Sequence, residues 1–223
     1  MKRLIAAAAA AVSMTATVHA QAPAAAPPAP PAPPPLIAPA LAPVFSVNVA
    51  TTAGLAPFGA QWRAREAKVV PATPMANAAP GYTASYTLDP RAEAPAFDDS
   101  AWTSGVSLSD RTGAGGLSFV WYRTSLTMPA KIGDFDTAGA RAVLTVVVDD
   151  YAEVWVNGEL PRRAGLPSPA AIVGFNMPNR VTLTMAVKPG EKIPVAILAI
   201  NGPLSVVPQN PIFFREAHID FYR

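Results

Sequence analysis

Few side chains of this chain could perform acid–base or nucleophilic catalysis, because it holds two histidines and no cysteine. His19 lies in an apolar N-terminal segment, which leaves His218 as the remaining imidazole. Glu216, His218 and Asp220 alternate along an expected strand and therefore share one of its faces. Two carboxylates beside an imidazole could hold a divalent metal or pair a base with its orienting group. A solvated strand face explains the same pattern more simply, so we predict no catalytic site here.

Two further catalytic patterns lack support. No serine stands in the Gly-x-Ser-x-Gly context of a nucleophile elbow, so the sequence does not indicate a Ser-His-Asp triad. The glycines between Gly113 and Gly116 could suggest a phosphate cradle, but that chemistry needs a helix after them, and a strand is expected from Leu117. We therefore predict that the chain is not an enzyme. A small hydrolase that uses the three strand residues above is the least favoured alternative.

Two pairs of adjacent carboxylates, Asp98-Asp99 and Asp149-Asp150, could ligate calcium. No third oxygen-rich segment accompanies either pair at a recognisable loop spacing. Asp98 is instead expected to cap the turn that ends at Trp102, a residue expected in the core, since its carboxylate can accept free backbone N–H groups. The sequence predicts no metal and no cofactor, and a structural calcium at one of these pairs is the alternative.

Aromatic side chains offer the remaining chemistry, because an indole can stack on the apolar face of a sugar ring while polar neighbours bind its hydroxyls. Packing into the core is the simplest role for each of the four tryptophans. Trp155 lies beside Glu153 on the face opposite the valines of its strand, and Trp121 shares a face with Arg123. Loops that follow these strands supply further polar groups. The candidate ligand-binding residues are Trp121, Arg123, Glu153, Trp155, Arg162, Arg163 and Asn176.

The stretch between residues 141 and 160 indicates the architecture. It reads as a strand over Ala142–Val148, an acidic break, and a second strand over Tyr151–Val156. Asn157-Gly158 follows, a dipeptide that accepts positive φ at both positions of a tight hairpin turn. One face of the second strand is wholly apolar, so another layer must cover it. The stretch therefore predicts a β-sandwich.

Ten short strands are expected, with Pro, Gly, Asn or Asp in nearly every gap, no internal repeat and no sustained helical period. Only Phe97–Trp102 is expected to form a short helical turn. This pattern predicts an all-β jelly-roll sandwich. The expected strands are Phe45–Val49, Gln61–Val70, Tyr82–Leu88, Gly105–Ser109, Leu117–Met128, Ala142–Val148, Tyr151–Val156, Arg180–Ala186, Ile193–Ile200 and Ile212–Tyr222.

The first 43 residues are expected to lie outside this sandwich. Residues 1–20 combine a basic start, an apolar run and small residues before Gln21, which indicates a signal peptide, with an uncleaved membrane anchor as the alternative. Residues 21–43 are almost entirely alanine and proline, which indicates a disordered, extended linker. The domain then covers residues 44–223, and we expect it in the periplasm or secreted.

The charge balance argues against two classes of partner. The chain holds 17 basic and 15 acidic residues, and the first twenty residues contain two of the basic ones and none of the acidic ones. The fifteen basic and fifteen acidic residues that remain cancel. Without a basic surface we expect neither nucleic acid nor an anionic membrane as a partner beyond the export signal.

Several motifs occur in an order that resembles the galactose-binding-like jelly roll, as in the sugar-binding domain of family 2 glycoside hydrolases. They are FDDSAW at 97–102, WYR at 121–123, AEVWVNG at 152–158 and KPGE at 188–191. A narrower similarity is to the accessory domain that precedes the β-propeller of some exported bacterial gluconolactonase-like proteins. It is carried by VDDYAEVWVNGELP at 148–161, GFNMPNRV at 174–181, INGPLS at 200–205 and IDFYR at 219–223.

The resemblance implies the fold and a carbohydrate-related setting. The sequence stops at Arg223, where the propeller would begin, so the resemblance does not imply lactonase activity. We expect an exported, non-catalytic accessory module that binds carbohydrate or a cell-envelope glycan. The alternative is a protein–protein interaction or structural domain that partners a separate enzyme, either gluconolactonase-like or a glycosidase.

Overall fold

The computed structural model describes residues 42–77, 81, 84–113, 116–161, 171–172, 177–202 and 209–223. The expected signal peptide and all but the end of the expected linker lie outside these residues, and the domain boundary at residue 44 stays a prediction. No helix in the described part of the chain has both the length and the apolar character needed to cross a membrane.

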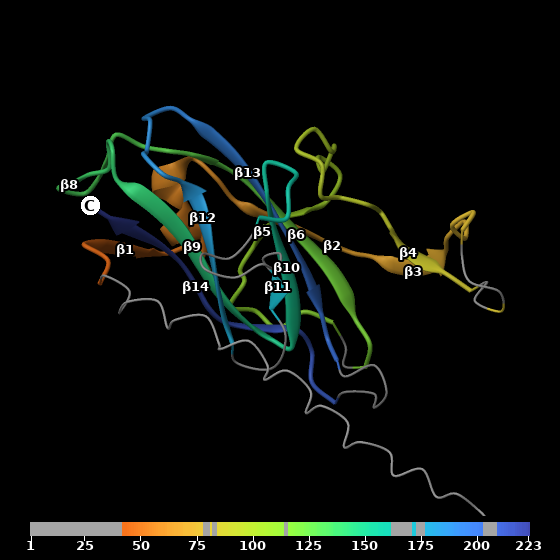
Figure 1. The fold of residues 1–223 in the computed structure, drawn as a ribbon. Helices are drawn as coiled ribbons and strands as arrows, with labels where there is room; N and C mark the ends of the chain where they lie inside the picture. The colour runs from red at the N-terminus through yellow and green to blue at the C-terminus, as the bar shows by residue number, and fades with distance from the viewer. Residues whose placement is uncertain are drawn as a thin grey trace, which may run out of the picture. The chain divides into compact units, whose positions relative to one another are not determined.

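Two antiparallel sheets form the sandwich (Figure 1). The order of the four-stranded sheet is β1 (Phe45–Asn48), β14 (Phe213–Tyr222), β9 (Arg141–Asp149) and β12 (Pro178–Thr184). The order of the six-stranded sheet is β11 (Ala171–Ile172), β10 (Tyr151–Val156), β13 (Lys192–Ile200), β6 (Phe119–Thr127), β2 (Trp62–Glu66) and β5 (Thr103–Val106). The long strands β6, β9, β10, β12, β13 and β14 alternate between the sheets, which confirms the predicted jelly roll.

Smaller elements complete the fold. Two short antiparallel ribbons are β3 (Lys68–Pro71) with β4 (Tyr86–Asp89), and β7 (Lys131–Ile132) with β8 (Phe135–Asp136). One helical turn runs through α1 (Thr52–Leu55) and the 3-10 helix η1 (Ala56–Phe58). In Figure 1 the β3–β4 ribbon stands apart from both sheets.

The core lies between the two sheets and follows the period of two in each strand. In β9 alternate residues from Ala142 to Val148 face inward, and in β10 the inward residues are Ala152, Val154 and Val156, as predicted. Tyr122 of β6 meets Phe214 of β14 edge-to-face across the sandwich, with ring centroids 5.1 Å apart. Each such buried aliphatic or aromatic side chain contributes about 1.5–3 kcal/mol, so the alternation itself holds the sheets together.

The predicted tight turn is confirmed. Asn157 and Gly158 have φ of 52° and 79°, and Val156 and Glu159 exchange both backbone hydrogen bonds, with N···O distances of 2.8 and 3.0 Å. A Cβ on Gly158 would lie 2.5 Å from Cδ of Pro95, so the turn also packs closely against the segment around residue 95.

Two local predictions are wrong. The single strand expected over Gln61–Val70 is broken at Ala67, whose N–H donates to the carbonyl of Phe119, and the chain beyond it leaves the sheet to pair with β4. Phe97–Trp102 is not helical and contains only a reverse turn, closed by a 3.0 Å hydrogen bond from the Trp102 N–H to the Asp99 carbonyl. The helical turn lies instead after Thr51, whose hydroxyl caps it by accepting the Gly54 N–H.

Candidate functional site

The outer face of the six-stranded sheet presents side chains in rows that run across the strands. The antiparallel register places Trp155, Ala196, Arg123 and Arg63 in one row, and Glu153, Leu198, Trp121 and Arg65 in the next. Residues directly opposite one another in neighbouring strands have Cβ atoms about 5 Å apart, so each row is a continuous surface. The shared faces predicted for Trp121 with Arg123 and for Glu153 with Trp155 are confirmed.

Residues 87–102, here called the covering segment, lie against this face. The indole of Trp121 donates to the carbonyl of Pro90 at 3.0 Å. The Nε of Arg123 donates to Asp99 at 2.9 Å, and the same guanidinium also donates to the carbonyl of Ala92. A second apolar cluster forms beneath the segment, made of Ala67, Ala92, Trp102, Trp121, Ala196 and Leu198. This sheet is therefore buried on both sides over part of its area.

The covering segment leaves a groove along the β10 side of the face. The groove has a volume of about 280 Å³ and is lined by Thr87, Leu88, Arg91, Glu93, Trp121, Glu153, Trp155 and Leu198. Trp155 is half-buried and packs against the second apolar cluster, so part of its indole faces the groove. Three predicted ligand residues, Trp121, Glu153 and Trp155, meet here.

Glu153 fixes the orientation of the indole. Its carboxylate accepts the Nε1–H of Trp155 at 3.1 Å through one oxygen and the hydroxyl of Tyr151 at 3.1 Å through the other. Burial, followed by the charge of Glu153, raises the pKa of Tyr151 to about 12, so the phenol stays a donor at neutral pH. Because both oxygens are engaged on the strand's own side chains, Trp155 is held in place before any ligand arrives.

The opposite wall of the groove carries a pair of charges. The guanidinium of Arg91 is hydrogen-bonded to one oxygen of Glu93. The other oxygen, Oε2 of Glu93, is buried and has no hydrogen-bond partner within the described part of the chain. The groove thus combines an oriented indole with a cation and an unused acceptor. Arg91 and Glu93 were not predicted from the sequence, because they follow no strand period and reach the groove only where the covering segment crosses the sheet.

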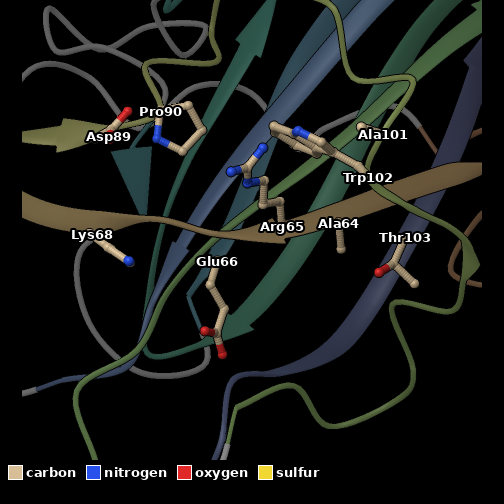
Figure 2. Close-up of a pocket in the computed structure, with 9 residues that line it drawn as sticks. All are labelled: Ala64, Arg65, Glu66, Lys68, Asp89, Pro90, Ala101, Trp102 and Thr103. Atoms are coloured by element: carbon tan, nitrogen blue, oxygen red, sulfur yellow. The ribbon is translucent and has the colours of Figure 1, made fainter.

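A second hollow lies on the β2 and β5 side of the same face (Figure 2). Its volume is about 460 Å³, and its lining residues are Ala64, Arg65, Glu66, Lys68, Asp89, Pro90, Ala101, Trp102 and Thr103. Leu88 and Arg91 border the groove while Asp89 and Pro90 border this cavity, so the covering segment passes between the two.

The other predicted ligand residues and the two remaining tryptophans lie elsewhere or outside the described residues. Arg123 is not in the groove: it is 5% exposed and is held beneath the covering segment by Asp99. Trp102 is buried, as expected, but in the outer apolar cluster and not between the sheets. Trp62 is in the central core, where its indole donates to the carbonyl of Val49 at 2.8 Å. Arg162, Arg163 and Asn176 lie outside the described residues, so their role stays a prediction.

The two acidic pairs have other partners. Asp98 accepts the backbone N–H of Ser100 at 3.0 Å, which lowers the pKa of Asp98 and confirms the predicted cap. Asp99 forms ion pairs with Arg63 and Arg123. Asp149 lies 3.3 Å from Arg215, and Asp150 accepts the N–H of Gly202 at 3.0 Å. Within the described ranges, no group of three or more His, Asp or Glu side chains is arranged to hold a metal ion.

The face predicted for Glu216, His218 and Asp220 is confirmed as the outer face of the four-stranded sheet. Asp220 is buried there and accepts the hydroxyls of Ser46 at 2.9 Å and Thr145 at 3.1 Å, and its carboxylate lies 3.4 Å from Nε2 of His218. The carboxylate of Asp220 thus has partners on β1, β9 and β14, so its role is to hold these three strands together.

No family model matches the chain, and no curated protein matches it. Among solved structures, the chain is similar to a β-glucuronidase 2 of Bacteroides uniformis covalently bound to cyclophellitol-6-carboxylate aziridine, with 15% identity, a TM-score of 0.46, and coverage of 79% of this chain and 18% of that chain. It is also similar to a glycosyl hydrolase family 2 member from Bacteroides cellulosilyticus, with 14% identity, a TM-score of 0.47, and coverage of 80% and 21%.

The chain therefore spans about a fifth of the length of these solved structures. Family 2 glycoside hydrolases are also the family whose sugar-binding domain the sequence motifs resemble. At these identities and TM-scores the likeness gives no information on what this chain binds, so the site must be interpreted from its own residues.

Proposed function

We propose that this chain is a non-catalytic accessory module that binds carbohydrate in the groove of Trp155. The observation that carries the proposal is the half-buried indole of Trp155, locked by its hydrogen bond to Glu153 and facing a groove with a cation and an unused carboxylate oxygen on its other wall. A rigid aromatic platform with a few placed polar groups is the usual composition of a small-ligand site.

The chemistry of the groove matches a sugar ring. A pyranose has an apolar face of C–H groups and an equator of hydroxyls. The indole of Trp155 and the side chain of Leu88 supply apolar surface for that face. Arg91 can donate to a ring or hydroxyl oxygen, and Oε2 of Glu93 can accept a hydroxyl hydrogen. Glu153 keeps Trp155 oriented, so the ligand does not have to order it.

A protein-binding role is the second candidate, because one face of the β3–β4 ribbon is apolar. Val69 lies opposite Leu88 and Pro71 lies opposite Tyr86, so these four side chains share a face. Val69 is 47% exposed and Tyr86 is 66% exposed. The surface at Trp155 is concave rather than flat, which favours the sugar for the groove itself.

The purified chain should be screened on a glycan array, and every hit should be followed by calorimetry. We expect a saturable hit that Trp155→Ala weakens at least about tenfold, because the stacking platform is lost. Tyr86→Ala is the matched control, since it removes an exposed aromatic outside the groove and should leave affinity unchanged. An array without hits, or a hit that is insensitive to Trp155→Ala, would refute this function for the groove.

The remaining expectations belong to the same proposal. Residues 1–20 act as an export signal, residues 21–43 as a linker, and the module works in the periplasm or after secretion. Its partner would then be a glycan, with a separately encoded enzyme as the alternative. Fusion of residues 1–43 to a reporter enzyme that is active only after export tests the signal, and a reporter retained in the cytoplasm would contradict it.

A further inference from the structure

The cavity on the β2 and β5 side of the face contains a buried donor without an acceptor. Trp102 is 5% exposed, and its Nε1–H is buried and unpartnered among the described residues. The three other indoles differ, because Trp62, Trp121 and Trp155 all donate to protein oxygens. A buried N–H without an acceptor is costly, so a native structure that keeps one has a reason for it.

The indole of Trp102 is held firmly. Its ring meets the edge of Phe97 with centroids 5.4 Å apart, and the guanidinium of Arg123 lies 5.4 Å from the centroid of the same phenyl ring. Arg123 is in turn tied to Asp99 at 2.9 Å. The N–H of Trp102 is therefore pre-positioned, because neither ring can turn without disturbing this chain of contacts.

A second donor points into the same space. Figure 2 shows the side chain of Arg65 reaching toward the indole of Trp102, while Glu66 points away from both. Within the described residues, the guanidinium of Arg65 makes no hydrogen bond and no ion pair, and the side chain is exposed. Two donors cannot bond to each other, so both are available to an acceptor that is not among the described residues.

The surroundings select the charge of that acceptor. Arg65 and Lys68 bring two positive charges to the cavity, and Glu66 and Asp89 bring two negative ones. A dianion such as phosphate would meet the two carboxylates without enough cations to offset them, whereas a single carboxylate needs only Arg65 and one N–H. The carboxylates can accept hydrogen bonds from sugar hydroxyls, the hydroxyl of Thr103 can accept or donate, and Pro90 and Ala64 supply apolar wall.

We infer that this cavity binds a carboxylate-bearing sugar, with the carboxylate seated between the Nε1–H of Trp102 and the guanidinium of Arg65. The exposed side chain of Arg65 rotates outward to admit the carboxylate and then closes on it. The site is separate from the groove of the proposed function, because different residues line it and the covering segment lies between them.

The indole N–H signals of the four tryptophans test the inference by NMR, since Trp102 and Trp155 report the two sites separately. The ¹⁵N-labelled chain should be titrated with D-glucuronate, and with D-glucose as the probe that lacks the carboxylate. We expect a saturable shift of the Trp102 signal with glucuronate and none with glucose. No shift of that signal with glucuronate, or an equal shift with glucose, would overturn the proposal.

Two further anions sharpen the test. Acetate that shifts the Trp102 signal at the same concentrations as glucuronate would show that the sugar ring adds nothing, and would overturn the sugar part. Inorganic phosphate that binds more tightly than glucuronate would overturn the choice of a carboxylate. The two proposals are tested by different signals. A neutral sugar that shifts only the Trp155 signal would support binding in the groove, and the response of the Trp102 signal to glucuronate decides the inference about the cavity.

Variants assign the donors. Arg65→Gln should weaken glucuronate binding at least about tenfold, since a hydrogen bond between charged groups is lost. Trp102→Phe keeps a ring and removes only the N–H, and it should weaken binding severalfold, read from fast-exchange shifts of backbone amides. Lys131→Gln, which removes a cation of β7 outside the cavity lining, is the control and should change nothing. Unchanged affinity in Arg65→Gln would contradict the inference.

Discussion

The outer faces of the two sheets are buried by different means. On the six-stranded sheet, another stretch of chain, the covering segment, lies over Trp121 and Arg123 and encloses apolar side chains. On the four-stranded sheet, the strands' own long side chains lie over it. The guanidinium of Arg141 is 4.7 Å from the ring centroid of Tyr222, and Arg180 is hydrogen-bonded to the Tyr222 hydroxyl.

The difference explains why the candidate sites lie on only one of these faces. A segment that crosses a sheet cannot match it everywhere, so it leaves hollows on both sides of its path. Side chains that belong to the four-stranded sheet lie over it around Tyr222, and Asp220 beneath them has donors on both oxygens. A hollow of about 390 Å³ remains at the β1–β14 edge, but no Trp, Tyr or Phe of the described chain lines it. The first arrangement makes cavities lined by aromatic and charged groups, and the second makes a polar network of the strands' own side chains.

The largest effect should come from removing the anchor of the covering segment. Trp121→Ala should lower the free energy of unfolding by about 3–5 kcal/mol, because it deletes a fully buried indole. It should also abolish binding in the groove. Urea denaturation measures the first effect and calorimetry the second. Trp121→Phe keeps a ring but loses the hydrogen bond to Pro90 and should cost clearly less. A loss below about 1 kcal/mol in Trp121→Ala would mean that the segment is not held there.

An intermediate effect is expected on the other face. Asp220→Ala should lower stability by roughly 2–3 kcal/mol, because the hydroxyls of Ser46 and Thr145 lose their shared acceptor. Glycan affinity should not change, since the four-stranded sheet is not part of either hollow. Asp220→Asn keeps one acceptor oxygen and should be milder. Weakened glycan binding in Asp220→Ala would contradict the division of roles between the faces.

The smallest effect concerns pH and the second buried acid of the four-stranded sheet. Burial first, then the neighbouring Asp150, raises the pKa of Asp149 from 3.8 to about 6. The folded state then binds this proton more tightly than the unfolded state, so stability falls as pH rises from about 4 to 6. Asp149→Asn should remove that slope and exceed the original chain in stability by roughly 1–2 kcal/mol at pH 7.5.

Denaturation at pH 4 and at pH 7.5 checks this prediction. Asp134→Asn, a change at an exposed acid, is the control and should keep the original pH dependence. If the two chains lose the same stability between pH 4 and 7.5, the carboxyl of Asp149 does not titrate as described.

The sequence was most informative where local geometry decides the outcome. The alternation of Tyr151, Glu153 and Trp155 against valines placed those side chains correctly, because a strand's period of two leaves no other choice. The Asn157-Gly158 turn was equally predictable from its tolerance of positive φ. Glu153 and Trp155, two residues of the groove, were therefore predicted to lie side by side without knowledge of the strand order.

Long-range contacts set the limit. The strand expected over Gln61–Val70 has similar β-propensity on both sides of Ala67. It breaks there because the first half pairs with β6 and the second half pairs with β4, which the sequence does not show. The face on which Arg123 lies was predicted, but the covering segment that binds Arg123 through Asp99 was not. Arg91 and Glu93 escaped prediction for the same reason, since their place depends on the path of residues far from β10 in the sequence.

The strand order of the four-stranded sheet has a consequence for the timing of folding. β14 is the last strand of the described chain, yet it lies in the interior of the sheet between β1 and β9. The hydrogen bond from Ser46 to Asp220 spans 174 positions of sequence. During synthesis β1 therefore has no partner until residues 213–222 emerge, and the sheet closes only then. Contacts of such long range form slowly, so the nascent chain exposes two unpaired strand edges, those of β1 and β9, until β14 is made.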